Sequence, residues 1–169
     1  MIVCETERLI IRHFELNDAD YVLKQLNEES FIQFIADKNV RNLIDAKKYL
    51  QEGPLSSYKT HGFGLNIVLL RQSNTAIGMC GLVKRDGLEH PDLGFAFLPD
   101  FWGKGYAMEA NKAVLNDAVM THNLKIILGI TLPENSASNC LLTRLGFEPS
   151  GSINLYGSED NLYQYQPNC

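Results

Sequence analysis

The stretch FWGKGYAMEA, residues 101–110, has the residue types and spacing most suggestive of chemistry in this chain. Gly103 and Gly105 flank Lys104 between an apolar alternating segment and a segment of helical period. A helix start leaves its first N–H groups without intrahelical partners and carries the positive end of the helix dipole, so it favours a bound phosphate. Glycine lacks the Cβ that would block close approach. The pattern therefore predicts a pyrophosphate seat, with an ordinary glycine turn as the alternative.

Three other motifs that would imply different chemistry do not fit. A Walker loop needs Ser or Thr after its lysine, whereas Lys104 is followed by Gly105. A dinucleotide fingerprint needs a further glycine three residues later, where the chain has Met108. The G-x-S-x-G signature of a serine nucleophile is absent from the sequence, so a covalent acyl-enzyme is not indicated.

Composition indicates one domain spanning residues 1–169, since 169 residues with 45% hydrophobic content suffice for one sizeable core. A net charge of -5 and a pI near 5.3 argue against a nucleic-acid partner and favour a cationic acceptor. The charged start at Glu5, Glu7 and Arg8 predicts no signal peptide. No apolar run approaches the ~18 residues of a membrane span, so we expect a cytoplasmic protein with no membrane partner.

The cysteines predict neither a metal centre nor a disulfide framework. Cys4, Cys80, Cys140 and Cys169 are scattered, without C-x-x-C spacing or clustering with histidine. We expect reduced thiols and no bound metal.

Periodicity and turn residues predict an α+β fold. Strands are expected over 8–14, 63–70, 76–84, 92–98 and 126–131, with a closing hairpin over 147–155 and 161–166. Helices are expected from 17 or 18 to about 27, then over 28–35, 42–53, 105–121 and 136–145. The strands between 63 and 98 should form an antiparallel meander, because turn residues separate them.

Several sequence blocks, taken in order, resemble a known family. DLGFAFLPD (92–100), FWGKGYAMEA and TLPENSASNCLLTRLGF (131–147) together resemble the GNAT superfamily of acyl-CoA-dependent N-acetyltransferases. The opening TERLIIRHFELNDAD (6–20) is similar to its RimJ/RimL-like subgroup, which acetylates protein N-termini and, in relatives, small amines. The resemblance implies a mixed, mostly antiparallel sheet with helices on both faces. It also implies that the fourth and fifth strands, here 92–98 and 126–131, splay apart to admit acyl-CoA.

The activity implied is acetyl transfer from acetyl-CoA to a primary amine of a protein N-terminus, a small amine or a polyamine. Direct attack in a ternary complex is expected. Acceptor specificity should come from the early helices, 17–58, and the final hairpin, 156–163. A non-catalytic acyl-CoA binder or sensor stays open, because Leu142 stands where many GNAT enzymes have a tyrosine. A plain interaction module, and either a monomer or a homodimer, also stay open.

The resemblance assigns the cosubstrate-binding residues. Main-chain groups at Ala96 and Phe97 would pair with the pantetheine arm, and the N–H of Phe97 or Leu98, freed by a bulge, would stabilise the oxyanion. Asn135 corresponds to a pantetheine-binding asparagine, with a helix cap as the alternative. The pyrophosphate would be held chiefly by N–H groups of Trp102, Gly103, Lys104, Gly105, Tyr106 and Ala107, while the Lys104 side chain is either a phosphate contact or solvated.

Catalytic candidates are fewer. In the RimL-like pattern Ser138 would protonate or hydrogen-bond the leaving sulfur, although it could equally bond a carbonyl in its own helix. Asp92 stands where the subgroup has a glutamate and is the first candidate base. Glu109 is the second, with a solvated helix face as its alternative. His90 lies in a turn, where a surface histidine is the commoner interpretation.

Overall fold

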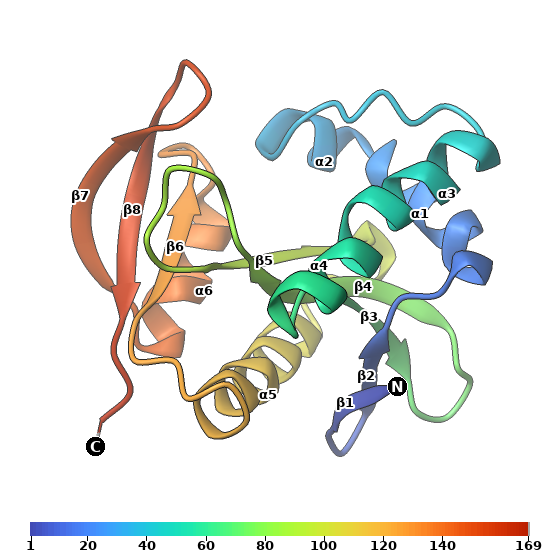
Figure 1. Ribbon diagram of the computed structural model, residues 1–169, viewed down its shortest axis with the longest axis horizontal. Helices are drawn as coiled ribbons and strands as arrows, with labels where there is room; N and C mark the ends of the chain where they lie inside the picture. Colours follow the sequence, from blue (N-terminus) through green and yellow to red (C-terminus); the bar gives the residue numbers. More distant parts are fainter. Residues whose placement is uncertain (169) are drawn as a thin grey trace.

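One eight-stranded sheet crosses the whole molecule in the computed structural model, which describes residues 1–168 (Figure 1). The strand order is β1-β2-β3-β4-β5-β6-β8-β7. The strands are β1 (Ile2–Glu5), β2 (Leu9–His13), β3 (Leu65–Leu70), β4 (Ala76–Val83), β5 (Asp92–Phe97), β6 (Ile127–Thr131), β7 (Glu148–Asn154) and β8 (Glu159–Tyr165). All neighbours are antiparallel except β5 and β6, so the predicted mixed α+β sheet is confirmed.

Helices cover both faces of the sheet. One face carries α1 (Ala19–Leu26), α2 (Glu29–Phe34), α3 (Leu43–Glu52) and α4 (Pro54–His61), and the other carries α5 (Tyr106–Met120) and α6 (Ser136–Leu145). Short 3-10 turns, η1 (Leu16–Asp18) and η2 (Pro99–Phe101), precede α1 and α5. Each face therefore has its own hydrophobic core.

The central strands are apolar on both sides, as a sheet covered by helices on both faces requires. In β3, Val68 packs in the α5–α6 core, whereas Ile67 and Leu69 pack in the α1–α4 core. The alternation follows from successive side chains pointing to opposite faces of a strand. Both cores consequently depend on the register of the β3–β5 meander, which is antiparallel as predicted.

Within residues 1–168, the one parallel strand pairing is short. Asp92 of β5 lies opposite Leu128 of β6, and the N–H of Leu128 donates to Pro91 O at 2.9 Å. Beyond that contact the two strands separate, and β6 and β8 stand at an angle to β5 (Figure 1). The predicted splay between the fourth and fifth strands of the family pattern is confirmed here between β5 and β6.

Two elements were not predicted from the sequence. β1 pairs with β2 at the sheet edge, and its few residues leave little periodicity to recognise. Helix α4 begins at Pro54, directly after Gly53, where the pair was expected only to end a helix. Proline fits the first turn of a helix because its missing N–H would have no partner there. The Gly53-Pro54 pair therefore joins two helices, α3 and α4.

A cluster of polar contacts joins the turn between β1 and β2 to the start of α5. Glu109 accepts hydrogen bonds from the Thr6 hydroxyl at 2.5 Å, from Arg8 N–H at 3.0 Å and from Arg8 Nε at 2.6 Å. The same guanidinium donates to Lys104 O at 2.9 Å and lies 4.4 Å from the centre of the Tyr106 ring. Glu109 is thus not part of a solvated helix face. It fixes the segment that leads into α5.

Replacing Glu109 by glutamine should lower the free energy of unfolding at neutral pH by about 0.2–1 kcal/mol, the typical contribution of a solvent-accessible ion pair. Burial by itself would raise the pKa of the Glu109 carboxyl, but hydrogen bonds from Thr6 and Arg8 outweigh it and lower the pKa below 4.5. A carboxyl with a lowered folded-state pKa stabilises the fold above its unfolded value, and that stabilisation is lost as pH falls through the folded value.

Urea unfolding of both proteins from pH 7 to pH 3 measures this difference. The gap between wild type and Glu109→Gln should be constant near neutrality and shrink below pH ~4.5. Glu134→Gln, at an exposed position outside the ion pairs found in residues 1–168, is the matched control and should follow the wild type. A gap that stays constant to pH 3 would contradict the assigned role.

Candidate active site

The loop from η2 to α5 adopts the backbone that its glycines allow. Gly103 and Gly105 have φ values of 71° and 81°, in the left-handed region that other residues rarely adopt. Gly105 is the N-cap of α5. Both glycines therefore have a structural role, since each makes a turn that leads the chain into the start of α5.

The amides of this loop point away from protein acceptors. Within residues 1–168, no N–H group from Gly103 to Met108 donates to a protein acceptor, and the first return bond of α5 runs from Glu109 N to Gly105 O at 3.1 Å. These N–H groups at a helix start have the arrangement expected for binding a diphosphate. The structure thus leaves the predicted donors from residue 103 to residue 107 available.

Trp102 departs from the predicted pattern. Its main-chain N–H is already bonded to Pro99 O at 3.1 Å, and its indole N–H donates to Phe97 O at 2.9 Å. The prediction that the Trp102 N–H binds phosphate is therefore wrong, because that donor is used to close η2. The Lys104 ammonium also bonds back to its own loop, at Asp100 O, 3.2 Å away.

The edge of β5 that faces β6 carries a second set of main-chain groups, which no neighbouring strand pairs with. Leu98 N–H donates to Ile77 O at 2.9 Å, so Leu98 and, by alternation, Ala96 direct their main-chain groups toward β4. Phe95 and Phe97 direct theirs to the opposite edge, where β6 has separated. The predictions for Ala96 and Leu98 as free donors are wrong, while the Phe97 N–H is available.

A bulge was also expected to free the Phe97 donor, and none is present. The β4–β5 register is regular from Asp92 to Phe97. The donor is instead exposed because the neighbouring strand diverges. The loss of pairing with β6, and not the sequence of β5, leaves the Phe97 amide free.

The start of α6 follows the end of β6 and borders the opening between β5 and β6 on that side. Asn135 caps the helix, since its side-chain oxygen accepts the Ser138 N–H at 3.2 Å. Ser138 is half-buried, and its hydroxyl forms no hydrogen bond within residues 1–168. Leu142 is fully buried in the α5–α6 core, where its side chain packs against Gly129. The helix-cap role of Asn135 is thus confirmed, and the Ser138 hydroxyl remains available for a ligand.

Asn139 was not singled out from the sequence, yet it is the centre of the polar network behind this opening. Its side-chain oxygen accepts hydrogen bonds from Thr131, from the Tyr163 hydroxyl at 2.8 Å and from Asn161 at 3.1 Å. Its amide nitrogen donates to Asn135 O at 2.9 Å. The partners lie on β6, β8 and α6, so only the folded chain reveals the role. Asn139 holds the end of β6 to the helix that carries Ser138.

Asp92 is placed beside the opening but is already paired. Its carboxylate is 2% exposed and binds Arg85 through two contacts, Nε to Oδ1 at 2.7 Å and Nη2 to Oδ2 at 3.2 Å. Burial raises the pKa of the Asp92 carboxyl, and the ion pair with Arg85 opposes that rise. The third guanidinium nitrogen of Arg85 donates to the Tyr156 hydroxyl at 3.3 Å. Asp92 therefore orients Arg85 in this structure.

The structure also places the other two titratable candidates, Glu109 and His90. Glu109 lies in the contacts with Arg8 described above, on the β2 side of α5. His90 lies in the turn before β5, with its Nε2 4.0 Å from the Glu89 carboxylate. Neither side chain lines the cavity described next.

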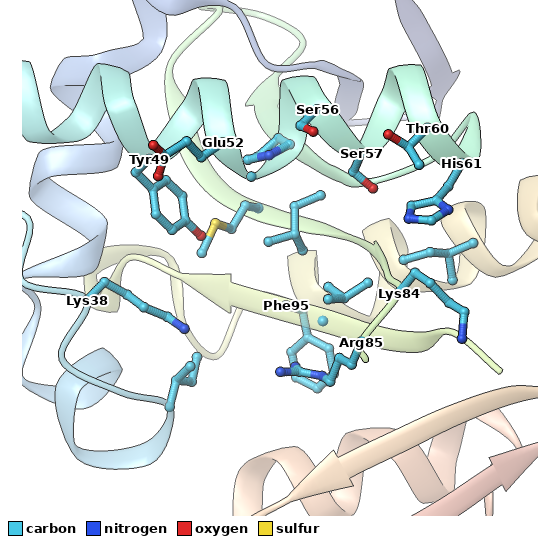
Figure 2. Close-up of a pocket in the computed structure, with 18 of the residues that line it drawn as sticks. Lys38, Tyr49, Glu52, Ser56, Ser57, Thr60, His61, Lys84, Arg85 and Phe95 are labelled. Atoms are coloured by element: carbon cyan, nitrogen blue, oxygen red, sulfur yellow. The ribbon is translucent and has the colours of Figure 1, made fainter. Parts of the chain in front are cut away.

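A cavity of about 350 Å³ lies on the α1–α4 face, over β4 and β5 (Figure 2). The α3–α4 segment lines it with Tyr49, Glu52, Ser56, Ser57, Thr60 and His61. The sheet side contributes Met79, Leu82, Lys84, Arg85, Gly94 and Phe95. The cavity borders β5 at Gly94 and Phe95, close in sequence to Phe97, whereas Phe97, Asn135 and Ser138 are not among its lining residues.

Two further features of residues 1–168 bear on other functions. Residues 1–168 contain no group of three or more His, Cys, Asp or Glu side chains placed to hold a metal ion. None of the helices in this range is both long enough and apolar enough to cross a bilayer. Cys4, Cys80 and Cys140 are free thiols, and Cys169 lies outside the described residues.

Comparison with known proteins identifies the family. Residues 8–148 match the acetyltransferase (GNAT) domain. The uncharacterized N-acetyltransferase YnaD of Bacillus subtilis (strain 168) is 28% identical over 146 residues, which cover 86% of this chain and 82% of YnaD.

Solved structures share the fold. RimL, a ribosomal L7/L12 alpha-N-protein acetyltransferase in complex with coenzyme A, superposes with a TM-score of 0.85 at 15% identity, covering 98% of both chains. The microcin C7 self-immunity acetyltransferase MccE, in complex with acetyl-CoA and AMP, superposes with a TM-score of 0.81 at 16% identity, covering 96% of this chain and 94% of MccE. The matched domain, the splayed sheet and the open helix start together show that the chain belongs to the GNAT family and is an N-acetyltransferase.

Proposed function

We propose that the protein transfers an acetyl group from acetyl-CoA to a primary amine by direct attack in a ternary complex. The observation that carries the proposal is the combination of free amides from Gly103 to Ala107 with a free Phe97 amide on the diverging edge of β5. One set suits a diphosphate and the other suits a developing oxyanion. Both lie on one continuous stretch of chain, from β5 through η2 to α5.

The residues present fit acetyl-CoA. The turn at Gly103 has no atom within 4 Å of a Cβ position, so the backbone can be approached closely there. The edge of β5 from Phe95 to Phe97 can pair with an extended arm as a further strand would. Acetyl-CoA, when bound, would supply the acetyl group as an activated thioester, and CoA would leave as a free thiol when the C–S bond breaks.

Within the site, Phe97 N–H donates to the developing oxyanion, and Ser138 holds a proton at its hydroxyl for the departing sulfur. Asn135 and Asn139 fix Ser138 by capping and anchoring the start of α6. Asp92 keeps Arg85 oriented toward the cavity and does not act as the base, because both its oxygens are engaged. An α-amine, with its pKa near 8, is partly neutral at physiological pH and needs little help from a base.

Acetyl transfer is tested by mixing the protein with acetyl-CoA and a panel of peptides, small amines and polyamines, and following free thiol. At least one acceptor should release thiol in step with N-acetylated product. The assay needs a parallel measurement of CoA affinity by calorimetry. CoA binding without thiol release from any acceptor would favour the non-catalytic binder or sensor, which the buried Leu142 leaves open. Absence of both would remove the proposal.

Gly103→Glu should weaken CoA binding by about a hundredfold, since it places a carboxylate among the amides meant for the diphosphate and each hydrogen bond to a charged group contributes about 1.5–3 kcal/mol. Gly157→Glu is the matched control. Gly157 has a φ of 86° and, like Gly103, open space around its Cβ position, but it lies in the β7–β8 turn. Calorimetry with both folded variants measures the affinity for CoA. Equal affinities of the two variants would contradict the proposed diphosphate site.

A further inference from the structure

The charge lining the cavity over β4 and β5 is opposite in sign to that of the whole chain. Lys38, Lys84 and Arg85 line it, and Glu52 is the sole carboxylate among its described lining residues. The chain as a whole has a net charge of -5. Asp92, which lies behind Arg85, neutralises that guanidinium. The uncompensated positive charge in the cavity therefore comes from the two lysines.

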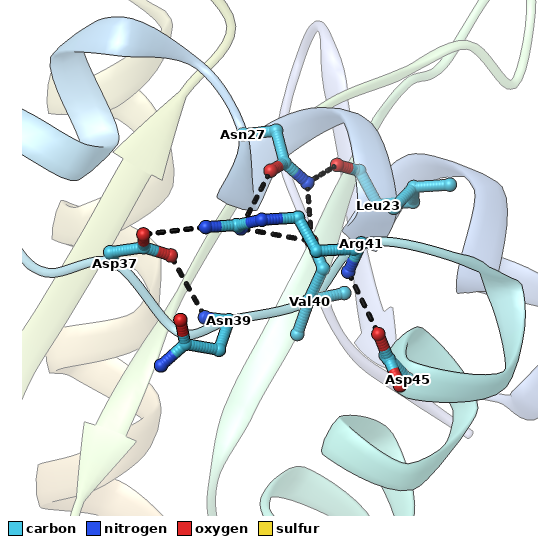
Figure 3. A network of polar contacts seen from close by, with 7 residues as sticks. All are labelled: Leu23, Asn27, Asp37, Asn39, Val40, Arg41 and Asp45. Carbon is cyan, nitrogen blue, oxygen red and sulfur yellow. Dashed lines mark hydrogen bonds and ion pairs between the residues drawn. The ribbon is translucent and has the colours of Figure 1, made fainter.

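The loop between α2 and α3, which carries Lys38, is anchored by polar contacts of neighbouring residues (Figure 3). Arg41 Nη2 lies 2.6 Å from Asp37 Oδ2, and Arg41 Nη1 donates to Asn27 Oδ1 at 3.1 Å. Asn27 also donates to Val40 O at 2.8 Å, which ties the loop to the end of α1. In Figure 2 the Lys38 ammonium reaches inward from one wall of the cavity, with Arg85 across from it. The loop contacts thus fix the backbone at Lys38, whose exposed side chain lies at the rim of the cavity.

Neither lysine is neutralised by a carboxylate. None of the ion pairs found in residues 1–168 involves Lys38 or Lys84. The Lys84 ammonium donates to the main-chain oxygens of Leu88 and Glu89, which are neutral groups. Glu52 lies 3.9 Å from Lys48, which is not a lining residue. The cavity therefore has a positive field that would favour an anionic group on its ligand.

The remaining lining is largely apolar. Phe31, Ile35, Tyr49 and Met79 supply an aromatic and aliphatic wall. A cavity of about 350 Å³ accommodates a molecule of amino-acid size, and it borders β5 at Gly94 and Phe95, on the strand that carries the Phe97 amide. The lining thus combines an apolar surface with a cationic end.

We propose that the acceptor is a small amine that also carries a carboxylate or phosphate and an apolar group, and that Lys38 determines specificity by binding the anionic group. The proposal rests on the proposed acetyl transfer, whose acceptor class it names. It replaces the expectation of a cationic acceptor, which followed from net charge alone. Charges far from the site are screened over about 8 Å at physiological salt, whereas the lining charges act at contact.

The kinetic test compares L-phenylalanine with L-phenylalaninamide, which differ only in the anionic group, by thiol release at saturating acetyl-CoA. The free acid should be preferred about tenfold in kcat/KM, the effect of one charged contact. The amide has the less basic amine and so more of the reactive neutral form. A preference for the acid must therefore come from recognition.

Lys38→Gln should reduce that preference to within about twofold, through a higher KM for the acid and no change for the amide. Lys47→Gln, at an exposed position on α3 that does not line the cavity, should leave both acceptors unchanged. Equal use of acid and amide by the wild type, or a preference for the amide, would overturn the proposal. So would a Lys38→Gln variant that keeps the wild-type preference.

A binding experiment tests this inference separately from the proposed function, because ligand binding requires no turnover. Calorimetry with 3-phenylpropionate and 3-phenylpropanol should show tighter binding of the carboxylate to the wild type, and Lys38→Gln should abolish the difference. Binding of the carboxylate through Lys38 without thiol release from any amine would reject acetyl transfer while retaining the anion site. A carboxylate that binds no tighter than the alcohol would reject the anion site, whatever the transfer assay shows.

Discussion

The separation of β5 from β6 is the constraint on which the rest of the site depends. The strands meet only where Asp92 lies opposite Leu128, and beyond that point the outer edge of β5 has no neighbouring strand. An unpaired strand edge exposes main-chain donors and acceptors that a continuous sheet would consume. The Phe97 amide is available for this reason alone, while Ala96 and Leu98, on the same strand, bond to β4.

Both flanks of this opening are held by polar contacts that do not belong to the reaction itself. On one side Glu109 and Arg8 fix the loop before α5, with Arg8 also bonded to Lys104 O. On the other side Asn139 joins β6, β8 and α6 through both ends of its side chain. Buried or half-buried polar networks of this kind fix one arrangement because an unmatched donor or acceptor is costly. The free amides are thus pre-organised by groups that are themselves satisfied.

The two faces of the sheet divide the work. In the proposed function, the α5–α6 side would provide the helix start for a diphosphate and the α1–α4 side the cavity for an acceptor, with β5 between them. Arg85, which lines the cavity, also donates to the Tyr156 hydroxyl in the β7–β8 turn. Lys38, the proposed specificity residue, lies in the α2–α3 loop and so within the early segment 17–58 from which specificity was expected.

The sequence by itself determined the strands and helices of the central fold and the location of the open helix start. Those features depend on local periodicity and on Gly103 and Gly105, whose left-handed backbone few other residues adopt. Only the tertiary structure decided which donors and carboxylates are free. Four predicted candidates have suitable chemistry but are already engaged: Trp102, Leu98, Asp92 and Glu109. Their partners lie across a turn or far away in the sequence. Local sequence patterns carry no information on such pairing.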